Sequence, residues 1–64
     1  MATRKFTSVR QANRAMNAAR TPTARVRIAN RAVRDLGMQR TAGRRKFNAA
    51  VRGGATLSSS GRAG

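Results

Sequence analysis

Apolar and small residues recur at helical spacing in two stretches of the first 36 residues, on either side of Thr21-Pro22. Spacings of three and four residues place side chains on one face of an α-helix. Thr21 can cap a helix that begins with Pro22, and Gly37 suits the position after its last turn. The pattern therefore predicts helices over about 8–20 and 22–36. The two stripes, each spaced by three, four and three residues, are Val9, Ala12, Met16 and Ala19, and then Val26, Ala29, Val33 and Leu36.

A third helical pattern follows the first two. Phe47, Ala50 and Val51 share one face of a helix over about 41–52, and Gly53-Gly54 then ends it. The last residues of the chain are rich in Gly and Ser, which is typical of a flexible segment.

The residues before the first helix include two cations, and either Thr7 or Ser8 can supply the helix cap. We therefore interpret the 64 residues as one small unit with three parts. These parts are a basic arm over 1–7, helical segments over 8–52 and a flexible tail over 53–64.

The composition changes this picture, because it argues against a hydrophobic core. Twelve residues are large and apolar, and only nine of them are Leu, Ile, Val or Phe. The chain also carries 15 Lys and Arg residues against 1 acid, for a formal net charge of +14. Low hydrophobicity with high net charge is typical of disordered chains. We therefore predict an all-α or largely extended chain without an autonomous hydrophobic core, which a partner orders.

The composition also excludes several kinds of chemistry. The chain has no His and no Cys, and Asp35 is its only acidic residue. Zinc sites, disulfides, thiol nucleophiles and paired carboxylates are therefore impossible. No stretch resembles the run of about 20 apolar residues that a membrane-spanning helix needs. We predict a protein that is not an enzyme and has no cofactor, metal site, small-molecule substrate or membrane partner.

The charged residues instead favour nucleic acid. Arg outnumbers Lys by thirteen to two, and the planar guanidinium binds phosphate through two hydrogen bonds and stays charged when partly desolvated. Arg27, Arg31 and Arg34 share one face of the second predicted helix. The predicted nucleic-acid-binding residues are Arg4, Lys5, Arg10, Arg14, Arg20, Arg25, Arg27, Arg31, Arg34, Arg40, Arg44, Arg45, Lys46 and Arg52.

The apolar faces of the predicted helices cannot bind phosphate, so they require a partner other than nucleic acid. Because the chain is predicted to lack its own core, we expect its apolar stripes to dock on a larger protein assembly, such as a capsid shell or a ribosome. The predicted docking residues are Val26, Ala29, Val33, Leu36 and Phe47. With no Trp or Tyr and only two Phe, the chain offers no platform for stacking bases, which argues against base-specific recognition.

From Thr3 to Arg52 the composition resembles that of small arginine-rich internal proteins of viruses, such as the DNA-binding core proteins of small icosahedral phages, and that of protamines. The resemblance implies a structural protein inside the virion that neutralises phosphate and helps to package a genome, with DNA favoured over RNA. Two alternatives remain open. One is a small ribosomal protein that binds rRNA, and the other is a minor capsid-bound protein that docks through its apolar stripes. The arginine-rich residues 1–20 also fit a targeting segment.

Overall fold

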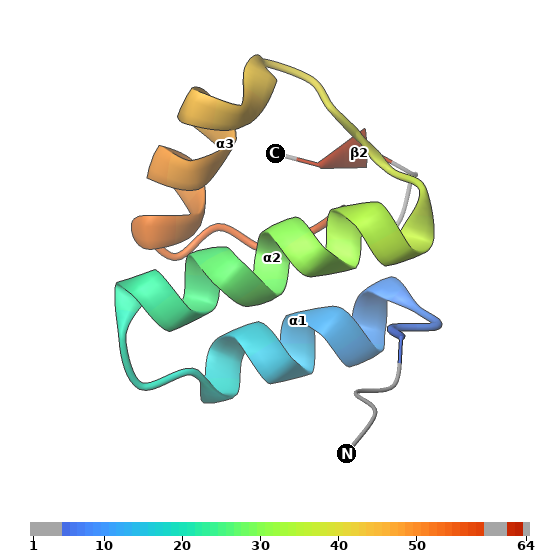
Figure 1. The fold of residues 1–64 in the computed structure, drawn as a ribbon. Coiled ribbons are helices and arrows are strands. Elements are labelled where there is room, and N and C mark those ends of the chain that lie inside the picture. The colour runs from blue at the N-terminus through green and yellow to red at the C-terminus, as the bar shows by residue number, and fades with distance from the viewer. Residues whose placement is uncertain (1–4, 59–61, 64) are drawn as a thin grey trace.

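Residues 5–58 and 62–63 are the part of the chain that the computed structural model describes, and they form three helices and two short strands. The chain reverses direction after α1, so that α2 runs back alongside it, and α3 packs against α2 (Figure 1). The predicted helical character is confirmed. The elements are α1 (Val9–Ala18), α2 (Pro22–Leu36), β1 (Gln39–Arg40), α3 (Gly43–Arg52) and β2 (Arg62–Ala63).

The first two helices begin at side-chain caps. The Ser8 hydroxyl accepts a hydrogen bond from the Gln11 amide at 3.1 Å, and the Gln11 side chain accepts one from the Thr7 amide at 2.9 Å. The Thr21 hydroxyl accepts from the Ala24 amide at 3.1 Å, and Pro22 occupies the first turn of α2. These bonds satisfy amides that have no partner inside the helix. Of the two caps considered for the first helix, Ser8 is the one used.

The second helix ends as predicted, at Gly37, which adopts the left-handed conformation with φ 66°. The Met38 amide donates to the carbonyl of Val33 at 3.0 Å, and the Gly37 amide donates to that of Arg34 at 3.3 Å. This pair of bonds is a Schellman motif, which favours Gly because a Cβ is strained at this φ. It also turns Met38 back against the last turn of α2, where its side chain is buried.

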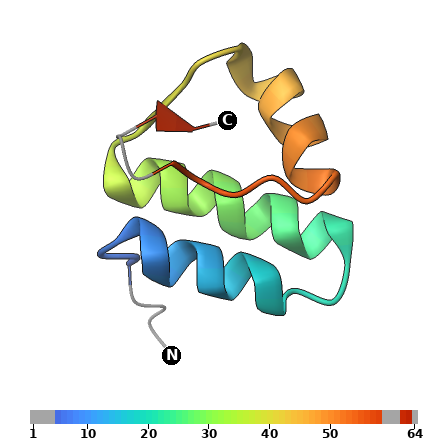
Figure 2. The same cartoon turned by 180° about the vertical axis from the view of Figure 1, so that it is seen from behind.

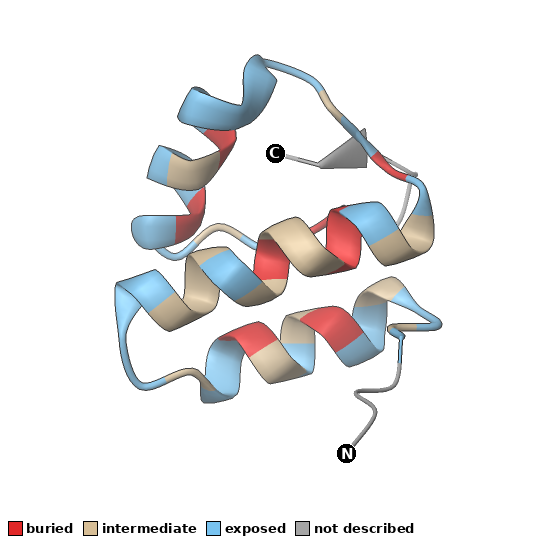
Figure 3. Cartoon of the chain, viewed as in Figure 1, coloured by how far each residue is buried: buried red, intermediate tan, exposed pale blue. Residues whose placement is uncertain are grey.

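The three helices enclose a small hydrophobic core, and their buried residues lie on the sides that face one another (Figure 3). The prediction that the chain has no core of its own is therefore not confirmed. Five of the nine buried residues are Ala or Met. The prediction rested mainly on the small number of Leu, Ile, Val and Phe residues, and it therefore underestimated the apolar surface that Ala and Met contribute to the core. Ala also lets neighbouring helices approach closely. The buried residues are Ala12, Met16, Ala29, Ala32, Val33, Met38, Phe47, Val51 and Leu57.

The segment 53–58 is not the flexible tail that its composition predicted. Leu57 is buried, and the Asn13 side chain donates to its carbonyl at 3.0 Å and accepts from its amide at 2.7 Å. In Figure 2 this segment runs across the helices from the end of α3. Residues 62–63 then form β2, which pairs in parallel with β1. The remainder of the predicted tail, residues 59–61 and 64, lies outside the described residues.

The described part of the predicted arm is attached to α2. The Phe6 amide donates to the Asp35 carboxylate at 3.0 Å, and the Arg31 guanidinium lies 5.5 Å from the centre of the Phe6 ring. The single acidic residue of the chain therefore holds the residues that precede α1. Residues 1–4 of the predicted arm lie outside the described residues.

Candidate nucleic-acid interface

The surface is strongly asymmetric in charge. In the described residues, ten Lys and Arg residues are exposed, whereas the carboxylate side chain of Asp35 is only 8% exposed. Phosphate would therefore meet cations with little competition from side-chain carboxylates. The exposed cations are Lys5, Arg10, Arg14, Arg20, Arg27, Arg34, Arg44, Arg45, Lys46 and Arg52. Arg4, which was also predicted to bind nucleic acid, lies outside the described residues.

Arg25 has an internal structural role, and its predicted contact with nucleic acid stays a prediction. Its guanidinium donates to the backbone carbonyls of Val51, Gly54 and Ala55 at 2.9, 2.8 and 2.7 Å, and to the Asn17 side chain at 3.0 Å. These carbonyls belong to the end of α3 and the turn that follows it. Arg25 therefore fastens the C-terminal segment to α2 and α1, and its donors are already engaged.

Two further arginines divide their contacts between the fold and the surface. Arg31 forms an ion pair with Asp35 at 3.7 Å, and its side chain is 38% exposed. Arg40 stacks over Phe47 at 5.4 Å and donates to the Asn30 side chain at 2.7 Å. The buried Nε of Arg40 has no hydrogen-bond partner among the described residues. Both side chains are therefore held in place before any ligand arrives.

A broad groove of about 820 Å³ lies between α2 and α3 and brings five arginines together. Its volume falls in the range typical of ligand sites. Val26, Val33 and Met38 contribute apolar surface to it. Of the five, Arg27, Arg31 and Arg34 were predicted to share a face, and the fold adds Arg40 and Arg44 from β1 and α3. The described residues that line it are Val26, Arg27, Asn30, Arg31, Val33, Arg34, Gly37, Met38, Arg40, Arg44 and Asn48.

The groove is held together by Asn30. Its amide nitrogen donates to the Asn48 side chain at 2.8 Å and to the Val26 carbonyl at 2.9 Å. Its carbonyl oxygen accepts the bond from Arg40. Asn30 therefore ties α2 to α3 and orients Arg40, and its role is to position other groups. The sequence offered no signal for this role, because it depends on a residue 18 positions away.

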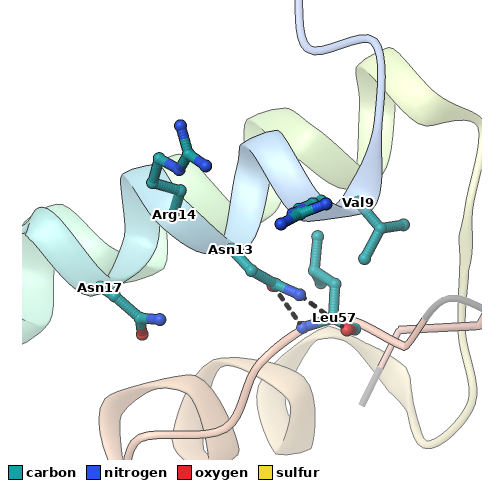
Figure 4. A pocket seen from close by; sticks show the side chains of 6 residues that line it. Val9, Asn13, Arg14, Asn17 and Leu57 are labelled. Carbon is teal, nitrogen blue, oxygen red and sulfur yellow. Dashed lines mark hydrogen bonds between the residues drawn. The ribbon is translucent and has the colours of Figure 1, made fainter.

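A second hollow, of about 600 Å³, lies on α1 beside the C-terminal segment. Figure 4 shows Asn13 turned toward Leu57 and Arg14 turned away from it, along the same helix. Arg10 lines the hollow one turn before Arg14. The described residues provide neither of these arginines with a hydrogen bond or an ion pair. The full lining is Val9, Arg10, Asn13, Arg14, Asn17 and Leu57.

The five predicted docking residues all contribute to the core of this chain. Ala29, Val33 and Phe47 are buried, and Val26 and Leu36 are half-buried and pack against the core. In this conformation the buried three are covered largely by the chain itself, although Val33 also reaches the arginine-lined groove. The apolar stripe packs against the other helices and Leu57, and docking on another protein stays a prediction.

Comparison with protein-family models, with curated proteins and with solved structures finds no match to this chain. None of the helices in the described part is both long enough and apolar enough to span a bilayer. The described residues also contain no group of three or more potential metal ligands. The groove itself offers exposed guanidinium groups beside two that are held in place, and their N–H groups are hydrogen-bond donors suited to phosphate oxygens.

Proposed function

We propose that this protein is a structural nucleic-acid-binding protein that neutralises phosphate and helps to condense or package a genome. The observation that carries the proposal is the presence of ten exposed cations in the described residues, while the only acidic side chain, that of Asp35 in α2, is largely buried and paired with Arg31. Phosphate contacts supply affinity without reading sequence. An excess of this kind, spread over the molecule, suits a polyanion better than a small ligand.

The arginine-lined groove supports the same ligand chemistry. Arg27, Arg34 and Arg44 are exposed at the groove, and Arg40 is already oriented by Asn30 and Phe47. Guanidinium groups form short charge-assisted hydrogen bonds to phosphate oxygens. Orienting a side chain before binding reduces the entropy that is lost on association.

Within this proposal, DNA packaging inside a virion is the favoured setting, and binding of rRNA in a ribosome is the alternative. The only large aromatic groups are Phe6 and Phe47. Phe47 is buried, and both rings are stacked by arginines of the same chain. Phe47 is therefore not free to stack on unpaired bases, and Arg31 already stacks on the half-buried Phe6 ring. This scarcity of free aromatic surface favours binding to a continuous backbone over base-specific recognition.

The test is the salt dependence of binding to duplex DNA. Contact with about six to ten phosphates would give a slope of about −5 to −9 for the logarithm of the association constant against that of salt concentration. Duplexes of equal length and unrelated sequence should bind with nearly equal affinity. A slope near zero, or a hundredfold preference for one sequence, would contradict the proposed function.

A further inference from the structure

Arg25 lies on one side of α2, and the exposed Arg27 and Arg34 lie on another. Arg25 points at the C-terminal segment, because it donates to the carbonyls of Gly54 and Ala55. Arg27 follows two residues later and is therefore turned by about 200° around the helix. Arg34 comes seven residues after Arg27, almost two full turns, and lies on nearly the same side. The arginine-lined groove therefore opens on the side of α2 that faces away from residues 53–58, whereas Arg40 at this groove belongs to β1, which pairs with β2.

The hollow on α1 lies on the other side, with the C-terminal segment. Leu57 lines this hollow, and Asn13 binds the backbone of Leu57 from α1. The segment that carries Leu57 passes behind α2 in Figure 1 and in front of it in Figure 2. Arg10 and Arg14 stand at this hollow, both exposed. The molecule thus has a groove surface, with Arg27 and Arg34, and an α1 surface, with Arg10 and Arg14.

The fold holds the two surfaces in a fixed relation. Arg25 bonds to Asn17 of α1 as well as to the C-terminal segment, and Asn30 joins α2 to Asn48 of α3. The two surfaces therefore cannot readily rotate toward one another. The helices form a flat body whose principal extents are 32 × 24 × 16 Å.

From this arrangement we propose that one molecule bridges two separate segments of nucleic acid, one on the groove surface and one on the α1 surface. A straight duplex presents its phosphates only to the side of the protein on which it lies. It therefore satisfies one surface and leaves the arginines of the other uncompensated. A second segment would neutralise them and be drawn close to the first. This inference rests on the proposed function, and it adds cross-linking of strands to the neutralisation of charge.

The experiment measures bridging separately from binding. One duplex DNA is attached to beads, a second labelled duplex is free in solution, and the captured label is measured as protein is added. A parallel titration measures binding of the protein to a single labelled duplex. The wild-type protein should bind in the second assay and capture labelled DNA in the first. Replacing the free duplex with double-stranded RNA shows whether the shared phosphate backbone or DNA alone is captured.

Three matched variants each remove two exposed charges. Arg27→Gln with Arg34→Gln removes the groove surface, and Arg10→Gln with Arg14→Gln removes the α1 surface. Each pair should lose capture of the second duplex while still binding a single duplex. The control, Arg45→Gln with Arg52→Gln, removes two exposed charges of α3 that line neither surface. It should weaken binding of a single duplex about as much as the other two pairs do, but it should retain capture of the second duplex. Circular dichroism should show equal helix content in all four proteins.

The outcomes separate this inference from the proposed function. Failure of the wild type to bind any duplex would contradict the proposed function itself. Binding without capture would overturn bridging alone, as would equal loss of capture in all three variants, which would indicate simple charge neutralisation. Self-association of the free protein in sedimentation would also overturn bridging by a single molecule.

Discussion

Two sides of the same helix use arginine in opposite ways. Arg25 and Arg27 are separated by one residue in the sequence, yet Arg25 makes four hydrogen bonds within the fold and Arg27 is exposed at the groove. The guanidinium group binds backbone carbonyls of the same chain on one side and is exposed at the groove on the other. In a chain with a small core, the same residue type thus supplies both tertiary structure and the binding surface.

The largest effect is expected on the internal side. Arg25→Gln should lower the free energy of unfolding by about 3 kcal/mol, because it removes several charge-assisted hydrogen bonds and leaves carbonyls unpaired. For a domain of this size that corresponds to a fall in Tm of roughly 12–24 °C. Thermal unfolding followed by circular dichroism in moderate salt measures it. Arg27→Gln is the matched control, and its unfolding free energy should change by less than about 0.5 kcal/mol.

The next effect concerns the segment that Arg25 holds. Leu57→Ala should cost about 2 kcal/mol, the lower end for a buried leucine, because a terminal segment can partly collapse into the space. The neighbouring exposed Thr56→Ala is the control. The same thermal unfolding measurement applies. Equal stability of the two variants would show that residues 53–58 are not held against the helices.

A smaller effect should follow from changing the single acid. Asp35→Asn removes the ion pair to the partly exposed Arg31 and should lower the free energy of unfolding by about 0.5–1 kcal/mol. It also removes the negative charge beside Arg31 at the groove. The salt slope of duplex DNA binding should then steepen by up to about 0.9. Weaker DNA binding by this variant would contradict the assignment of Arg31 to the binding surface.

That a partner orders the chain stays a prediction. It now rests on charge repulsion alone, because the chain has a hydrophobic core. The core exists, but the formal net charge of +14 opposes folding through self-repulsion. We therefore expect the helix content of the free protein to be low in low salt and to rise when a polyanion is added. A cooperative melt of the free monomer in low salt, unaffected by polyanion, would contradict this expectation.

Local signals in the sequence explain which parts of the fold were predictable. The bounds of α2 follow from Thr21-Pro22 and Gly37, whose capping preferences act within a few residues. The path of residues 53–58 depends on the pairing of Asn13 with Leu57, 44 positions apart, which no local pattern encodes. The residues from 53 to the end of the chain are rich in Gly and Ser, and we therefore predicted a flexible segment. The buried Leu57 side chain and the backbone bonds of Leu57 to Asn13 instead attach residues 53–58 to the helices.

The sequence predicted an arginine-rich face on the second helix, but it did not predict which other residues complete the groove. Thirteen arginines predicted phosphate binding, and the helical spacing of Arg27, Arg31 and Arg34 predicted a common face. The addition of Arg40 and Arg44 to that face depends on how α3 packs against α2. Nothing in the sequence distinguishes Arg25 from its exposed neighbours, because the distinction comes from tertiary hydrogen bonds.

Chemical modification of arginine, mapped residue by residue with mass spectrometry, tests this division most directly. The protein is treated briefly with phenylglyoxal in moderate salt, under conditions in which circular dichroism shows that it is folded, with and without duplex DNA. Arg27 and Arg34 should react quickly in the free protein and become protected in the complex, whereas Arg25 should react slowly in both. Rapid modification of Arg25 in the free protein, with protection by DNA equal to that of Arg27, would contradict the account.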